Sequence, residues 1–214
     1  MAYYQGYQRN SFYNSIPPVT RNILIINILV WLACLLPGQL AQWVLYYLAL
    51  FPIGSGNFKI YQLVTYMFTH VEFTHILFNM FALFMFGGVL ENYWGQKRYL
   101  IYYMVTGIGA GLTQLLVCYL QGVYEPTIGA SGAIFGLLLA FGMLFPETPL
   151  FLFFIPIPIK AKYFVIGYGL IEFFFGISSR SGDNVAHFAH LGGMLFGIIM
   201  ILIWRKKRKT FNFR

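Results

Sequence analysis

The chain has few charged residues and few cysteines. Only 9% of its 214 residues are charged, whereas about a quarter of the residues of a soluble globular protein are charged. The two cysteines, Cys34 and Cys118, lie far apart without Cys-x-x-Cys spacing, which argues against a metal or redox centre and favours two packing residues. The sequence also lacks an internal repeat and a low-complexity tract, so we do not expect a repeat architecture.

Apolar residues dominate instead, at 59% of the chain, and the mean hydropathy is +0.68. A span needs about 20 apolar residues, and helices in a bundle tolerate shorter apolar stretches by thinning the bilayer or by using flanking aromatic residues. We therefore predict an all-α, polytopic membrane protein with six transmembrane helices and no separate soluble domain. The six apolar stretches are 23–36, 74–90, 100–120, 130–145, 163–177 and 188–204.

The basic residues predict an orientation with both termini in the cytoplasm. Of the 14 Lys and Arg residues, only Lys59 and Arg180 would then lie outside, as the positive-inside rule requires. The chain divides into a cytoplasmic N-terminal segment (1–20), a six-span domain (21–204) and a basic cytoplasmic tail (205–214). A basic cluster directly after a span typically faces anionic lipid headgroups. We therefore expect the lipid bilayer, and no nucleic acid, as a partner.

Ser131 and His190 lie in two of the apolar stretches, where a polar side chain is unfavourable unless it faces the bundle interior or a water-filled cavity. In the predicted topology the second, fourth and sixth spans all begin at the outer face, so Ser131 and every histidine fall near one level. Four separate core histidines, each with its own hydrogen bonds, are the alternative interpretation. We favour a nucleophile and a general base, Ser131 and His190.

Such a pair requires that the two helix backbones approach closely, because the hydroxyl and the imidazole nitrogen must lie about 2.6–3.2 Å apart. Small residues four positions apart permit close approach of helices in membranes. Gly132 and Gly136 have this spacing in the fourth span, and Gly193 and Gly197 have it in the sixth. The pattern also occurs in many unrelated membrane proteins, so by itself it indicates only helix packing.

Three runs together resemble the rhomboid intramembrane serine proteases. They are GASGAIFG at 129–136, AHFAHLGGMLFG at 186–197 and HVEFTHILFN at 70–79. The likeness extends from about Tyr61 to Gly197 and implies a six-helix rhomboid-like bundle that uses neither a cofactor nor a metal. The first outer loop differs, because segment 38–60 contains Trp43 but no Arg, where many relatives have a Trp-Arg pair.

The resemblance also implies roles for individual residues. Ser131 matches the nucleophile and His190 the base, whereas His187 does not match the base. The side chains of His75 and Asn79, with the Ser131 backbone N–H, match the groups that stabilise the oxyanion. Phe135 matches a residue that stacks on the catalytic ring, and His70 matches one that braces the outer loop. Supporting glycines are Gly129, Gly132, Gly193 and Gly197.

We thus expect a serine endopeptidase that cleaves transmembrane segments of other membrane proteins near the extracytoplasmic face, using a Ser/His dyad. No carboxylate is predicted to contact the His190 ring, which Phe135 would orient instead. Glu172 is expected to be a structural residue that reaches water or a backbone N–H near the end of its span, with a relay or gate as the alternative. Loop 178–184 is a candidate lid for lateral access of substrate.

Two other classes of function remain open. A non-catalytic rhomboid-like protein that binds transmembrane helices would have the same fold. A haem or metal carrier would use as ligands the histidines that lie near one level of the membrane. The compact six-span plan favours the bacterial plasma (inner) membrane. Neither the identity of the substrates nor the oligomeric state follows from the sequence.

Overall fold

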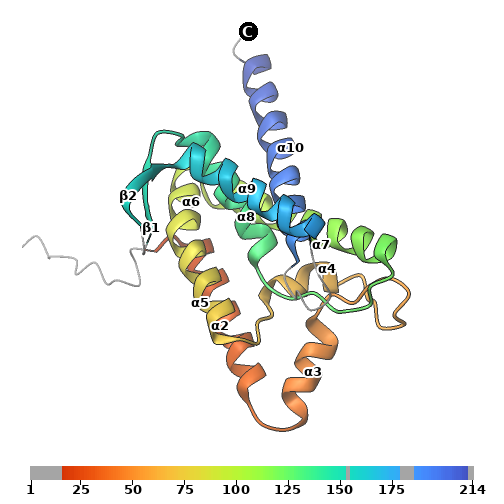
Figure 1. Cartoon of the computed structure of the whole chain (residues 1–214). Helices are drawn as coiled ribbons and strands as arrows, with labels where there is room; N and C mark the ends of the chain where they lie inside the picture. Colours follow the sequence, from red (N-terminus) through yellow and green to blue (C-terminus); the bar gives the residue numbers. More distant parts are fainter. Residues whose placement is uncertain (1–15, 153–154, 179–185, 212–214) are drawn as a thin grey trace, which may run out of the picture.

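The fold is a bundle of helices with one small hairpin (Figure 1). The computed structural model of the chain describes residues 16–152, 155–178 and 186–211. The predicted N-terminal segment up to residue 15 and residues 179–184 of the candidate lid lie outside the described residues. The helices are α2 (Pro18–Leu35), α3 (Gln39–Leu48), α4 (Gln62–Thr65), α5 (Phe73–Ala82), α6 (Gly88–Trp94), α7 (Gln96–Gln121), α8 (Ser131–Leu144), α9 (Ala161–Ser178) and α10 (His187–Phe211).

Among the described residues, five helical segments are long and apolar enough to cross a membrane. They are Pro18–Leu35, Phe73–Trp94, Gln96–Gln121, Ala161–Ser178 and His187–Lys206, the second of which joins α5 to α6 through a π-helical turn, Leu83–Gly87. The all-α membrane fold predicted from the sequence is therefore confirmed. The sixth apolar helix, α8, has only 14 residues and a length of about 21 Å, so the count of six spans stays a prediction.

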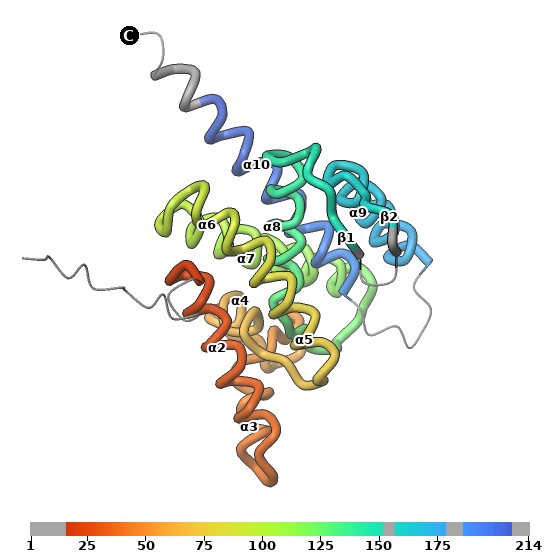
Figure 2. Tube along the Cα trace, turned by 90° about the vertical axis from the view of Figure 1, so that its left-hand side faces the viewer, coloured from red at the N-terminus to blue at the C-terminus, as the bar shows by residue number. Residues whose placement is uncertain are grey.

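The short helix α8 lies at the centre of the bundle. Every residue from Gly132 to Gly142 is buried, as expected of a helix that is apolar on all sides. It packs against α5, α7, α9 and α10, and in two perpendicular views it lies inside the other helices (Figures 1 and 2). The outer helices instead expose large apolar side chains, such as Phe174 of α9 at 63%, which suits contact with lipid tails.

Glycines allow the backbones of α7, α8 and α10 to approach one another. A Cβ atom at Gly132 would lie 2.4 Å from the Ala110 side chain of α7, and one at Gly136 would lie 2.6 Å from Thr106 of the same helix. A Cβ atom at Gly193 of α10 would lie 1.9 Å from the carbonyl oxygen of Gly132. Gly132 and Gly136 of α8 therefore face α7, and Gly193 provides the close contact between α8 and α10.

Two elements were not predicted from the sequence. Helix α3 forms a hairpin with α2 that projects on the side opposite the C-terminal end of α10 (Figures 1 and 2). Strands β1 (Pro149–Leu152) and β2 (Ile155–Lys160) pair antiparallel between α8 and α9. At the base of this hairpin the Glu147 carboxylate pairs with the ammonium groups of Lys160 and Lys162, and these hydrogen bonds lower the pKa of Glu147 to about 2.

Candidate active site

Ser131 is the first residue of α8, and the turn before it requires a glycine. Gly129 has a φ of +113°, in the region that L-residues with a side chain rarely adopt. Its N–H donates to the carbonyl of Tyr66 at 2.9 Å, and a Cβ atom there would lie 2.7 Å from the His75 ring. The turn leaves Ser131 at a helix N-terminus, where backbone N–H groups lack intrahelical acceptors and the helix dipole favours negative charge.

The Ser131 hydroxyl lies against the imidazole of His190. Its Oγ is 2.8 Å from Nε2 of His190, within the range for proton transfer from a nucleophile to a general base. His190 is on the first turn of α10, one turn before Gly193, and its ring is buried with 7% exposed. The tight contact of Gly193 with Gly132 thus lies next to the pair and fixes how closely the two helices approach.

A column of aromatic rings holds the plane of the His190 ring. Phe135 stacks on His190 with centroids 4.2 Å apart and an interplanar angle of 6°. Tyr168 of α9 stacks on the other side of Phe135 at 5.2 Å and 20°, and Phe164 follows at 5.6 Å. The sequence pointed to Phe135 but gave no sign of the two rings from α9.

A carboxylate contacts the other nitrogen of His190. Oε2 of Glu172, on α9, lies 2.8 Å from Nδ1 of His190 and 2.7 Å from Nδ1 of His187. The prediction that no carboxylate contacts the His190 ring was therefore wrong, as was the expectation that Glu172 reaches water or a backbone N–H. The physical reason is the rotation of α9, which turns Glu172 toward α10, and its 6% exposure shows that the side chain is enclosed by protein.

The three remaining predicted polar residues lie around the turn that leads to Ser131. His75 and Asn79 are both on α5, and His70 precedes that helix. Nε2 of His70 accepts hydrogen bonds from the backbone N–H of Ala130 at 3.3 Å and from the Asn79 amide at 3.1 Å. His70 therefore connects Asn79 to the turn, and one N–H of the Asn79 amide remains for another acceptor.

His70 must be neutral to accept these two hydrogen bonds. Its side chain is fully buried. Burial, followed by the positive charge that His75 can carry, lowers the pKa of His70 to about 3 from an ordinary value of 6.5. A neutral His70 thus keeps its hydrogen bonds with Asn79 of α5 and with Ala130, the residue before α8, throughout the neutral pH range.

Glu172, His187 and His190 are the group of described residues that could hold a metal ion, because their ligand atoms lie within 4.8 Å of one another. Two ligands about 2.0–2.1 Å from a tetrahedral zinc ion lie about 3.3 Å apart. The separations of 2.7 and 2.8 Å between the carboxylate oxygen and the two Nδ1 atoms are shorter and match charge-assisted hydrogen bonds. The geometry therefore fits a hydrogen-bonded network better than a metal site.

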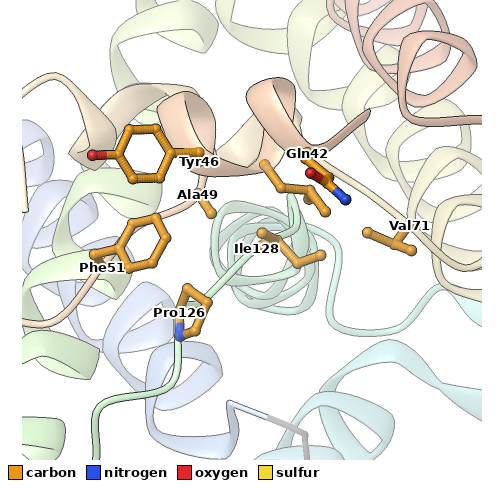
Figure 3. Close-up of a pocket in the computed structure, with 8 residues that line it drawn as sticks. Gln42, Tyr46, Ala49, Phe51, Val71, Pro126 and Ile128 are labelled. Carbon is orange, nitrogen blue, oxygen red and sulfur yellow. The ribbon is translucent and has the colours of Figure 1, made fainter. Parts of the chain in front are cut away.

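An apolar pocket of about 440 Å³ lies between α3 and the segment that precedes the Gly129 turn (Figure 3). Tyr46 of α3 and Phe51 line one side, and Val71 and Ile128 line the other. None of the residues predicted for the site lines this pocket. The Ser131–His190 pair therefore lies outside this pocket.

Comparisons with known proteins identify relatives of one family. The Rhomboid domain family matches residues 57–207. The chain is similar to "Rhomboid protein 1, mitochondrial" of Saccharomyces cerevisiae, 31% identical over 140 residues, covering 62% of this chain and 38% of the relative. "RHOMBOID-like protein 12, mitochondrial" of Arabidopsis thaliana is 31% identical over 178 residues, covering 74% of this chain and 51% of the relative. "Putative rhomboid protease YdcA" of Bacillus subtilis is 33% identical over 120 residues, covering 56% and 59%. The matched parts thus span between 38% and 59% of these relatives.

Proposed function

The chain belongs to the rhomboid family, and on that basis we propose that it is an intramembrane serine endopeptidase that cleaves transmembrane segments of other membrane proteins. The observation that carries the proposal is the 2.8 Å contact between Oγ of Ser131 and Nε2 of His190. A buried imidazole against a hydroxyl at a helix N-terminus is the arrangement that nucleophilic catalysis requires. One of the relatives is also named as a protease.

In the proposed reaction Ser131 Oγ attacks the carbonyl carbon of a peptide bond while Nε2 of His190 accepts the hydroxyl proton. The protonated ring then donates this proton to the departing amine, and the peptide C–N bond breaks to leave an acyl group on Ser131. Water, deprotonated by the same nitrogen, attacks the acyl carbon, and the proton returns to Oγ as the acid product leaves. The reaction consumes one water and needs no cofactor.

The negative charge on the tetrahedral carbonyl oxygen would be met by three donors. These are the Ser131 backbone N–H, the amide of Asn79 and the imidazole of His75. The first lies at the N-terminus of α8, and the hydrogen bond between Asn79 and His70 holds the second in place. Removal of one such donor in a serine protease raises the barrier by about 3–4 kcal/mol, so preorganised donors are a large part of the proposed catalysis.

The substrate class follows from the chemistry of a helix in a membrane. A transmembrane helix hides its carbonyl oxygens in intrahelical hydrogen bonds, so it must unwind before Ser131 can attack. Segments with helix-breaking or small residues near the extracytoplasmic face are the expected substrates. The cytoplasmic location of both termini and the bacterial plasma membrane stay predictions, because the relatives include mitochondrial proteins and a protein of Bacillus subtilis.

Labelling by a fluorophosphonate probe tests the proposal. The purified chain should form a stable adduct on Ser131, and Ser131→Ala should abolish it. His190→Ala should slow labelling by several orders of magnitude, since the base of a serine protease acts as a unit with the nucleophile. Equal labelling of all three proteins would refute the proposal and favour the alternative, a non-catalytic family member that binds transmembrane helices.

A further inference from the structure

Helix α9 faces the rest of the protein through a narrow stripe of buried residues. The stripe consists of Ala161, Val165, Glu172 and Gly176, whose spacing places them on one helix face. Glu172 is the only member with a polar side chain. A buried carboxylate is unfavourable unless it is fully hydrogen-bonded. The carboxylate of Glu172 in this stripe therefore requires hydrogen-bond donors from the helix that packs against α9.

Those donors are two histidines on the first turn of α10. His187 and His190 are three residues apart and thus lie on the same face. Both present Nδ1, and not Nε2, to the same carboxylate oxygen of Glu172, at 2.7 and 2.8 Å. An ionised carboxylate only accepts hydrogen bonds, so each Nδ1 must carry a proton when these contacts form.

A proton fixed on Nδ1 determines what the other nitrogen of His190 can do. In the neutral ring only one nitrogen is protonated, and therefore Nε2 presents its lone pair to Oγ of Ser131, 2.8 Å away. The same carboxylate lies in position to stabilise the imidazolium that forms when Nε2 takes up the serine proton. Stacking on Phe135 fixes the plane of the ring but cannot select a tautomer, because it acts equally on both.

We infer that Glu172 is a positioning residue, which holds His190 in the tautomer that can accept the Ser131 proton, with His187 as the second donor that anchors the carboxylate. This inference rests on the proposed function. It also connects two helices, because the nucleophile and the base belong to α8 and α10, whereas the carboxylate comes from α9. Movement of α9 away from α10 would remove the acceptor of the Nδ1 proton and leave the base without its orientation.

The variant that tests this inference is Glu172→Gln, which keeps the size of the side chain and removes its charge. We expect the maximum rate of fluorophosphonate labelling to fall about 10- to 100-fold with little change in the probe concentration for half-maximal rate. This is less than the 10⁴-fold effect of the corresponding change in a serine protease triad, because Phe135 still holds the ring plane. The matched control is Phe174→Leu on the same helix, whose side chain is 63% exposed and outside the network, and it should label at the native rate. The variant His187→Phe keeps an aromatic ring against Phe175 and removes one of the two donors to Glu172 but not the Glu172–His190 contact. It should lower the labelling rate by about threefold or less, which is a smaller loss than in Glu172→Gln.

A second measurement does not depend on activity. Nuclear magnetic resonance of the full chain with ¹⁵N-labelled histidine, in detergent micelles, should show Nδ1 of His190 protonated and strongly hydrogen-bonded, with Nε2 unprotonated. Glu172→Gln should shift the Nδ1 proton signals of both histidines toward those of a weaker hydrogen bond, and His187→Phe should remove one signal only. His190→Ala identifies the signal of His190.

The outcomes of these experiments distinguish the positioning role of Glu172 from the proposed protease activity. An unchanged His190 signal in Glu172→Gln overturns the positioning role, whatever the labelling shows. Equal loss of labelling in Glu172→Gln and His187→Phe overturns it as well, since the network would then only dock α9 onto α10. If Ser131→Ala labels as the native chain does while the Nδ1 signals respond to Glu172→Gln, the hydrogen-bond network stands and the proposed protease activity fails.

Discussion

The contact between Gly193 of α10 and Gly132 of α8 should control the distance between the base and the nucleophile. In Gly193→Ala the new Cβ atom would lie 1.9 Å from the Gly132 carbonyl oxygen, whereas contacts below 3.0 Å essentially never occur. Because the Cβ atom would meet a backbone atom of Gly132, which cannot move aside as a side chain could, helix α10 must shift by roughly 1 Å to restore a contact of 3.0 Å. His190 is one turn away on the same face, so its 2.8 Å contact with Ser131 would lengthen beyond hydrogen-bonding range. A misplacement of about 1 Å costs on the order of 10²-fold in rate.

The measurements are the second-order rate of fluorophosphonate labelling and the midpoint of thermal unfolding in detergent. We expect labelling of Gly193→Ala to fall about 10²-fold and the free energy of unfolding to fall by about 1–3 kcal/mol, as in other overpacked cores. Gly167→Ala on α9 is the matched control, because nothing lies within 4 Å of its added Cβ atom, and it should keep the native labelling rate. In Gly197→Ala the Cβ atom meets the Tyr102 hydroxyl at 2.4 Å, a side-chain group that can yield, so we expect an intermediate effect. Native labelling and native stability of Gly193→Ala would refute the reasoning.

Three further predictions follow from single contacts. Stability should fall as the pH drops from about 6.5 toward 3, because an unfolded His70 takes up a proton near 6.5 while the buried ring does so only near 3. Between these two pH values, His70 alone should make the free energy of unfolding fall by up to about 1.4 kcal/mol per pH unit. The midpoint of thermal unfolding, measured over a series of pH values, should therefore depend less on pH in His70→Gln than in the native chain. Glu91→Ala should lower the free energy of unfolding by about 2–4 kcal/mol, because the Glu91 carboxylate accepts hydrogen bonds from the backbone N–H groups of Val19 and Thr20 at the start of α2. Glu91→Gln should lower the free energy of unfolding by less when both variants are measured by thermal unfolding in detergent. Phe135→Leu removes the stacked ring and should slow fluorophosphonate labelling about two- to tenfold, equal to the 0.5–1.5 kcal/mol of an aromatic pair, whereas Phe135→Tyr should label at nearly the native rate.

The long apolar stretches were predictable because lipid imposes one length and one polarity on any helix that crosses it. Each expected stretch therefore overlaps a helix or a helical segment of the structure, from α2 to α10, with ends that agree to within a few residues. Helix α3 and the hairpin of β1 and β2 were missed, since they connect spans and have no comparable length constraint. The structure leaves aromatic side chains of α3, such as Trp43 and Tyr47, exposed, and such rings are favoured at a membrane interface.

The role of Glu172 could not be read from the sequence for a different reason. Depth along a span follows from counting residues, but the direction in which a side chain points around the helix axis depends on which neighbour the helix packs against. Two signals were present: the small residues Ala161 and Gly176 share a face with Glu172, and His187 shares one with His190. Neither pattern says that the two faces meet, and only the packing of α9 on α10 brings them together.

Distance and orientation in this site depend on different kinds of contact. The separation between α8 and α10 is set by backbone against backbone at Gly193 and Gly132, which leaves no side chain that could adjust. The orientation of the His190 ring is set by side chains from α8 and α9, Phe135 and Glu172, which can be replaced by groups of similar shape. Substitutions at the glycines should therefore impair stability and reactivity together, whereas conservative changes at Phe135 and Glu172 should alter reactivity while the bundle remains folded.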